Sequence, residues 1–229
     1  MKRTLDIEFS KFPSTPPATL SVHGEGQEYV RTIDINLERL AAFYKIEEFG
    51  DWTSPNSYKD YTALHYLLPN TDVFKFNSGH PGVAKDSRKE NSRTLGQALC
   101  RYFNYDFLDA PYTANVSTIL DTTLGPEFNG VTVKRKIKGD TPDFISVTST
   151  RSLFLSEAKG RRFIVPFTDD EFDKWRKQFD RITISDGKTT VSLKGYIFEL
   201  AIANETNKLP NSKILVEDPE TVGERDFDN

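Results

Sequence analysis

The chain has 229 residues, of which 37% are hydrophobic and 12% are aromatic. This composition is typical of a globular protein with a buried core and excludes a disordered chain. A single cysteine, Cys100, excludes an intramolecular disulfide and a multi-cysteine zinc site. No signal-peptide pattern follows Met1, and no apolar run approaches the roughly 18 residues that cross a bilayer. These features predict a cytoplasmic protein without a membrane partner.

The formal net charge of −4 is unevenly distributed. Residues 217–229 hold six acidic residues and one arginine, which leaves a net charge of +1 for residues 1–216. Basic residues gather in 134–138, in 159–162 and in 174–181. Such clusters suit contact with a phosphate backbone, although solvated surfaces carry them equally well. The charge pattern therefore permits nucleic acid as a partner without requiring it.

Residues 1–90 give a mixed pattern. Alternation of polar and apolar residues predicts strands at 4–9 and 29–35. Asn36 is a suitable cap for a helix that runs to about Phe49. Turn-forming residues dominate 50–90, around one short apolar piece, and predict no defined element. We predict that residues 1–90 form an α+β N-terminal extension or small lobe of unknown role.

Residues 91–205 are more regular, and we predict that they form the core domain. The patterns indicate a helix at 92–103, a short strand or helix end at 116–120, a strand at 130–137, hairpin strands at 142–149 and 151–160, a capped amphipathic helix at 168–181, and a strand within 191–203. We predict an acidic tail or linker over residues 206–229.

The hairpin carries two carboxylates and an ammonium group at a suggestive spacing. A three-residue turn places Asp143 opposite Glu157 and Ile145 opposite Leu155. Because strand side chains alternate between the two faces of a sheet, Glu157 and Lys159 project from the same face. The face is apolar in the middle and charged at one end, where a divalent metal would find oxygen ligands.

The order helix, three strands, helix, strand, together with Pro142-Asp143 and Glu157-Ala158-Lys159, resembles the PD-(D/E)XK nuclease superfamily over roughly residues 92–203. The resemblance implies an α/β fold with a restriction-endonuclease-like αβββαβ core, in which helices flank a mixed central sheet. It also implies that Asp143, Glu157 and the backbone carbonyl of Ala158 bind Mg²⁺ and that Lys159 is the catalytic lysine. We expect Mn²⁺ to substitute for Mg²⁺.

The residue types suit this chemistry independently of the resemblance. Mg²⁺ commonly takes one or two carboxylates, with water and substrate oxygens completing its octahedral shell. Lys159 lies beside two carboxylates and would stay charged, so it would orient water and stabilise phosphate charge rather than act as a free base.

At two positions this chain has a glutamine where the residues around it differ from those of other members of the superfamily. Many members have an acidic residue in the first helix, often after glycine, whereas this chain has Gln97 after Gly96. Gln97 either contributes to the metal site or is an exposed helix residue, and Glu90 is a nearby substitute. Gln178 in the second helix either faces the substrate phosphate or is solvated. Nucleic-acid-binding candidates are Arg161, Arg162 and Lys136.

The resemblance favours a metal-dependent deoxyribonuclease, a hydrolase of phosphodiester bonds. We expect a DNA endonuclease of a prokaryotic antiviral defence or mobile-element system. Its protein partner would be an ATPase, a helicase or a second copy of the chain. The alternative is a catalytically inactive nuclease-like module that binds nucleic acid or a protein partner.

Overall fold

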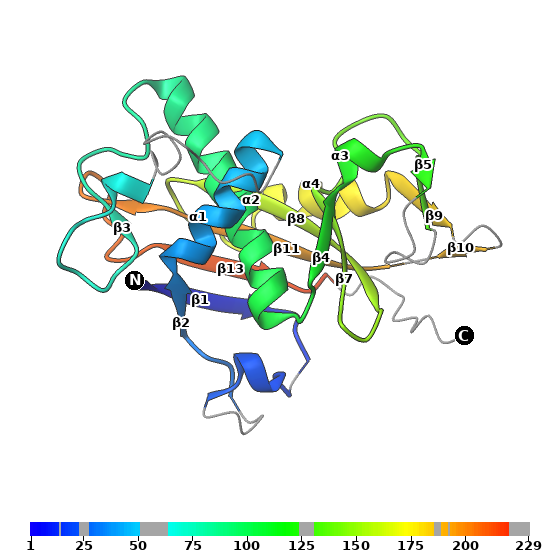
Figure 1. The fold of residues 1–229 in the computed structure, drawn as a ribbon, viewed down its shortest axis with the longest axis horizontal. Helices are drawn as coiled ribbons and strands as arrows, with labels where there is room; N and C mark the ends of the chain where they lie inside the picture. Colours follow the sequence, from blue (N-terminus) through cyan, green and yellow to red (C-terminus); the bar gives the residue numbers. More distant parts are fainter. Residues whose placement is uncertain are drawn as a thin grey trace.

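A seven-stranded mixed sheet forms the centre of the protein (Figure 1). The computed structural model describes residues 1–13, 15–22, 28–50, 64–123, 131–185, 189–191 and 193–219. The strand order in the sheet is β2-β1-β13-β11-β8-β7-β4. In chain order these strands are β1 (Lys2–Ser10), β2 (Thr32–Asn36), β4 (Tyr112–Asn115), β7 (Phe144–Val147), β8 (Leu153–Arg161), β11 (Lys194–Ala201) and β13 (Lys213–Glu217).

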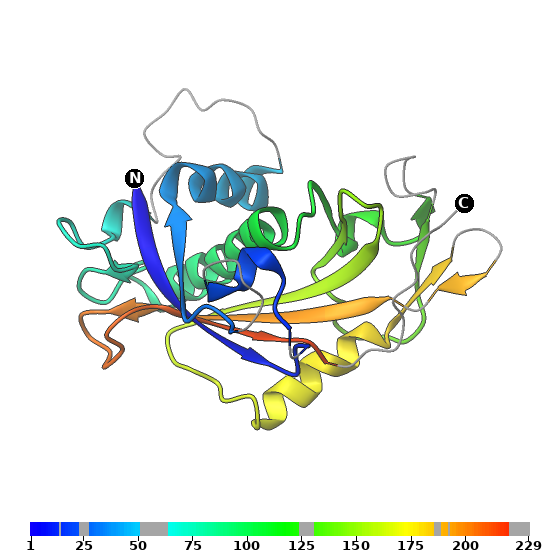
Figure 2. The same cartoon turned by 90° about the horizontal axis from the view of Figure 1, so that it is seen from below.

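Helices cover both faces of this sheet (Figure 2). The helices α1 (Leu37–Phe49) and α2 (Lys85–Phe107) lie on one face, and α4 (Asp170–Phe179) lies on the other. The helices α1 and α2 pack over one apolar cluster and α4 packs over another, so the sheet separates two cores. The prediction of an α/β protein with a mixed central sheet flanked by helices is therefore confirmed.

Side-chain caps explain where two of these helices begin. The Asn36 side chain accepts hydrogen bonds from the backbone of Glu38 and Arg39, as the sequence predicted for α1. The Asp169 side chain accepts from the backbone of Glu171 and starts α4. The helix α2 is 23 residues long and begins at Lys85, well before the predicted start.

Shorter elements lie around this centre. A second sheet has the order β10-β9-β6-β5, and a two-stranded sheet pairs β12 with β3. Their bounds are β3 (Lys75–Phe76), β5 (Thr122–Thr123), β6 (Thr132–Arg135), β9 (Ile182–Ser185), β10 (Thr190–Val191) and β12 (Ala203–Asn204). The short helices are η1 (Ala18–Leu20), η4 (Leu64–Tyr66) and α3 (Val116–Ile119). No helix within the described ranges has the length and apolar character needed to cross a membrane.

The first strand of the predicted core was wrongly identified. The strand predicted at 130–137 exists as β6, but it pairs with β5 and β9 in the second sheet. The strand β4 takes its place beside β7 in the central sheet. Because β4 is a four-residue, partly exposed edge strand, its alternation is too short to stand out. The core order is α2-β4-β7-β8-α4-β11, with β8 and β11 parallel and the other pairs antiparallel.

The two ends of the described chain belong to the same sheet as the core. The strand β1 pairs with β2 and with β13, and β13 also pairs with β11. The N-terminal extension or small lobe predicted at 1–90 is therefore joined to the core by continuous strand pairing. The predicted tail is wrong for 206–219, because the buried Ile214, Leu215 and Val216 form an inner strand. The tail was predicted from its acidic residues, but one of them, Glu217, is buried and forms an ion pair with Arg176. Residues 220–229 lie outside the described part.

Candidate active site

The hairpin of β7 and β8 brings the motif residues together. Ile145 pairs with Leu155 and Val147 with Leu153, in the predicted register. Asp143 directly precedes β7, and its Oδ2 accepts a hydrogen bond of 2.9 Å from the backbone N–H of Ala158. The first carboxylate of the motif is thus fixed against the backbone of the second motif segment.

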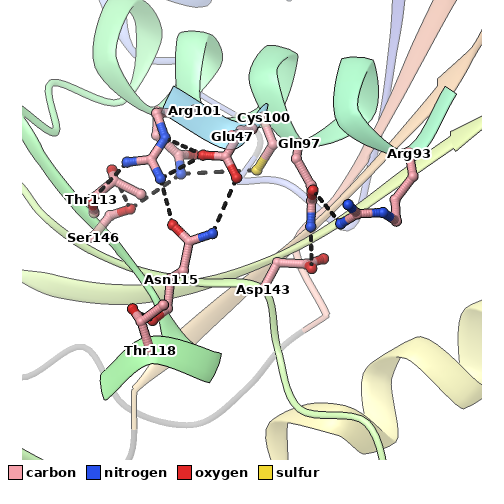
Figure 3. A network of polar contacts seen from close by, with 11 residues as sticks. Glu47, Arg93, Gln97, Cys100, Arg101, Thr113, Asn115, Thr118, Asp143 and Ser146 are labelled. Atoms are coloured by element: carbon pink, nitrogen blue, oxygen red, sulfur yellow. Dashed lines mark hydrogen bonds and ion pairs between the residues drawn. The ribbon is translucent and has the colours of Figure 1, made fainter. Parts of the chain in front are cut away.

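The helix α2 supplies the other support for Asp143. The Gln97 side chain is 7% exposed, and its Nε2 donates to Asp143 Oδ1 over 2.9 Å (Figure 3). Arg93, one turn earlier, donates to Gln97 Oε1 over 2.7 Å. Arg93 also bonds Glu90, which raises the pKa of Arg93. Gln97 is therefore a member of the site, and Glu90 contacts it only through Arg93.

Glu157 lies beneath the site on the face covered by α4. Its side chain is 1% exposed, and Oε1 both forms an ion pair with Lys159 and accepts a 2.8 Å hydrogen bond from Gln178 Nε2. Its second oxygen, Oε2, has no hydrogen-bond partner among the described residues. Burial, and secondarily the charge of Asp143, hold the pKa of Glu157 well above its usual value.

A basic cleft of about 630 Å³ opens over these residues. It lies between the first half of α2 and the end of β8 with the segment that follows. Seven cationic side chains line it, against the two carboxylates of Asp86 and Asp143; the cations are Lys85, Arg88, Lys89, Arg93, Lys159, Arg161 and Arg162. Such an excess of positive charge attracts a polyanion. Gln97, Ala158 and Phe163 also line the cleft.

The predicted nucleic-acid contacts divide into two groups. Arg161 and Arg162 line the cleft, whereas Lys136 does not. Arg161 forms an ion pair with Glu171, which reduces the charge it offers to a ligand. Arg162 donates to Thr206 over 3.2 Å, and its Nε has no partner among the described residues.

The basic side chains of α2 were missed by the sequence-based prediction. Lys85, Lys89 and Arg93 recur every four residues, which places them on one side of a helix. This spacing was the available signal. It was not recognised because residues 85–91 were assigned to an irregular segment, whereas the structure places them in the first two turns of α2.

Arg101, one turn beyond Gln97 on α2, belongs to a second polar network (Figure 3). Arg101 forms an ion pair with Glu47 of α1 and donates to Asn115 and to the Thr113 carbonyl. Arg101 and Glu47 have side chains 8% and 1% exposed. This network ties α1, α2 and β4 together. Cys100, which lies between the two networks, is buried, and burial raises the pKa of its thiol, so it is not an available nucleophile.

No protein-family model matches the chain, and neither curated proteins nor solved structures give a match.

The carboxylates of Asp143 and Glu157 are suited to hold one cation that prefers oxygen ligands. Among the described residues no group of three or more His, Cys, Asp or Glu side chains could hold a metal ion. Mg²⁺ does not require such a group, because one or two carboxylates with water suffice. A cation shared by Asp143 and Glu157 would give the buried, unpartnered Glu157 Oε2 a partner. It would also relieve the repulsion between the two carboxylates.

Proposed function

We propose that this protein is a Mg²⁺-dependent nuclease that hydrolyses phosphodiester bonds, and that its substrate is DNA. The observation that carries the proposal is the position of Asp143, Ala158 and Lys159 in the wall of a strongly basic cleft, with Glu157 directly below. The order α2-β4-β7-β8-α4-β11 supports it, because this is the αβββαβ order expected of a restriction-endonuclease-like core.

Asp143, Glu157 and the Ala158 carbonyl would hold the ion. A bound Mg²⁺ lowers the pKa of a coordinated water and neutralises charge on the scissile phosphate. Gln97 and the Ala158 N–H each bond one oxygen of Asp143, so the carboxylate is oriented before any ligand arrives. Gln178 orients Glu157 in the same way.

Lys159 would act on the phosphate and the attacking water. It forms an ion pair with Glu157 and lines the cleft, where a lysine ammonium group can donate hydrogen bonds to phosphate oxygens. A charged donor in the wall of the cleft stabilises the negative charge that develops in the transition state. The other cations of the cleft would hold the flanking phosphates, so binding should weaken as the salt concentration rises.

One observation favours the alternative of a binding module without turnover. Gln97 donates a hydrogen bond to Asp143 at the place where many nucleases of this type have another carboxylate. The site then offers two carboxylates instead of three. Under this alternative the module binds nucleic acid or a protein partner and does not cleave.

A cleavage assay separates the two. Plasmid, linear duplex and single-stranded DNA are incubated with the protein and Mg²⁺ or Mn²⁺, beside Asp143→Ala and Lys159→Ala. Asp140→Ala is the matched control, because Asp140 is exposed and does not line the cleft. We expect cleavage by the wild type and the control, and at least a 100-fold loss in both site variants. Equal cleavage by all four proteins contradicts the assignment, whereas DNA binding without cleavage supports the alternative.

A further inference from the structure

An exposed aromatic side chain stands in the wall of the basic cleft. Phe163 is 57% exposed and follows directly after Arg161 and Arg162. Single exposed apolar side chains are common on protein surfaces, so the exposure of Phe163 is informative only through its position in the wall of the cleft. In the described part of the chain, the other large apolar residues that are strongly exposed, such as Tyr112 of β4, do not line this cleft.

The segment that carries Phe163 is held on both sides. Before it, Arg162 donates to Thr206, and the Arg162 carbonyl accepts from Asn207 Nδ2 over 3.1 Å. After it, the Val165 N–H donates to the buried Glu199 over 2.9 Å, and the Val165 side chain is 3% exposed. These hydrogen bonds therefore fix the backbone on both sides of the exposed Phe163.

The Phe163 ring already has one cationic neighbour. The Arg161 guanidinium carbon lies 5.6 Å from the Phe163 ring centroid and 5.3 Å from the Trp175 ring. The ion pair with Glu171 fixes Arg161 in this position. Arg161 therefore acts as a support for the exposed ring, while Lys85 and Lys89 of α2 remain for phosphate contact.

We propose that Phe163 is a stacking platform for an unpaired nucleobase, so that the cleft takes single-stranded or locally unpaired DNA. This inference rests on the proposed function and specifies its substrate. In a duplex the faces of the bases are covered by their neighbours, and an aromatic side chain can stack only on a base that has left the stack. An aromatic ring beside a positively charged groove is the combination that recognises single strands.

The test measures DNA binding by fluorescence anisotropy in EDTA, where cleavage is prevented. The ligands are a labelled single-stranded oligonucleotide, the same strand in a duplex, and a single strand with abasic positions. Phe163→Ala removes the ring, and Phe163→Leu keeps apolar bulk without a π-face. Tyr112→Ala is the control, because Tyr112 is an equally exposed aromatic residue (53%) outside the cleft. Thermal melting checks that all variants are folded.

We expect the wild type to prefer the intact single strand. Phe163→Ala should weaken that binding about 10-fold or more, Phe163→Leu nearly as much, and Tyr112→Ala less than 2-fold. Neither variant of Phe163 should change binding to the abasic strand. If the wild type binds and cuts duplex DNA equally well and Phe163→Ala changes nothing, the stacking proposal is wrong and the nuclease proposal stands. If the wild type neither binds nor cuts any DNA, both proposals fail.

Discussion

The backbones of Gly96 in α2 and Gly160 in β8 lie in direct contact. A methyl group added to Gly96 would come within 2.6 Å of the backbone nitrogen of Gly160, and one added to Gly160 would come within 1.7 Å of the Ser92 carbonyl oxygen. Only glycine allows the helix and the strand to approach so closely. The contact lies beside the site, because Gly160 lines the basic cleft and Gly96 directly precedes Gln97, which bonds Asp143.

Substitution of either glycine by alanine should force α2 away from β8. We expect Gly160→Ala to lower the free energy of unfolding by about 3 kcal/mol and Gly96→Ala by about 1 to 3 kcal/mol, because overpacking shifts the backbone. Urea denaturation measures the loss. Gly79→Ala is the control, since its nearest neighbour would be 3.9 Å away. Equal stability of all three variants would show that the elements can separate without strain.

The buried ion pair of Arg101 and Glu47 should matter far more than an exposed one. Arg101→Met leaves the Glu47 charge buried without its partner and should cost about 3 to 5 kcal/mol of stability. The double variant Arg101→Met/Glu47→Leu should recover much of this loss. Arg39→Met removes the more exposed pair with Asp106 and should cost about 1 kcal/mol or less. Chemical denaturation of the four proteins checks the order, and a double variant as unstable as Arg101→Met would contradict it.

Gln97→Glu tests whether position 97 reaches the metal. Without metal, the new carboxylate faces Asp143 and loses the donated hydrogen bond, so the protein should be less stable by about 1 to 2 kcal/mol. With Mg²⁺ or Mn²⁺, a further carboxylate should tighten binding by about 10-fold, measured by titration calorimetry. Gln97→Ala controls for the lost hydrogen bond and should not tighten binding. Unchanged affinity in Gln97→Glu places position 97 out of reach of the ion.

Glu199 should make stability depend on pH. The side chain is fully buried, and burial raises the pKa of Glu199 from 4.5 to about 7; among its neighbours Arg161 and Lys213 oppose this rise, and Glu171 adds to it. Because the folded protein holds this proton more tightly than the unfolded chain, Glu199 lowers stability as pH rises from about 4.5 through 7.

Glu199→Gln keeps an acceptor for the Val165 N–H but cannot ionise. Relative to the wild type, we expect this variant to gain about 2 to 3 kcal/mol of stability between pH 5 and pH 8. Urea unfolding at both pH values gives the difference. Glu38→Gln, the same chemical change at a side chain that is 86% exposed, is the matched control. A Glu199→Gln difference of the same size at both pH values would contradict the assigned titration.

The parts of the site that the sequence predicted depend on short-range geometry. The positions of Asp143 and Glu157 follow from the alternation and register of one hairpin, which adjacent residues determine. Such relations span few residues and leave a clear pattern. Gln178, by contrast, was expected to face the substrate phosphate or the solvent, whereas it is buried and donates to Glu157.

The parts that the sequence did not predict depend on long-range pairing. Nothing local distinguishes β4 from a loop, and only its pairing with β7 makes it part of the core. Nor does the alternation of β6 reveal that its partner is β9. The segment 213–217 carries apolar residues beside buried acids, and the buried environment of Glu217 exists only once Arg176 is in place. The separation of these partners in sequence explains the errors.

The position of β13 between β1 and β11 has a consequence for how the protein is made. Asp6 pairs with Lys213, so β1 can complete this pairing only after about 200 further residues have been made. Until then β1 and β11 each expose an unpaired edge, which is a template for pairing with other chains. Contacts this distant in sequence also form slowly. We therefore expect newly made chains to need protection from aggregation until residues 213–217 are available to close the sheet.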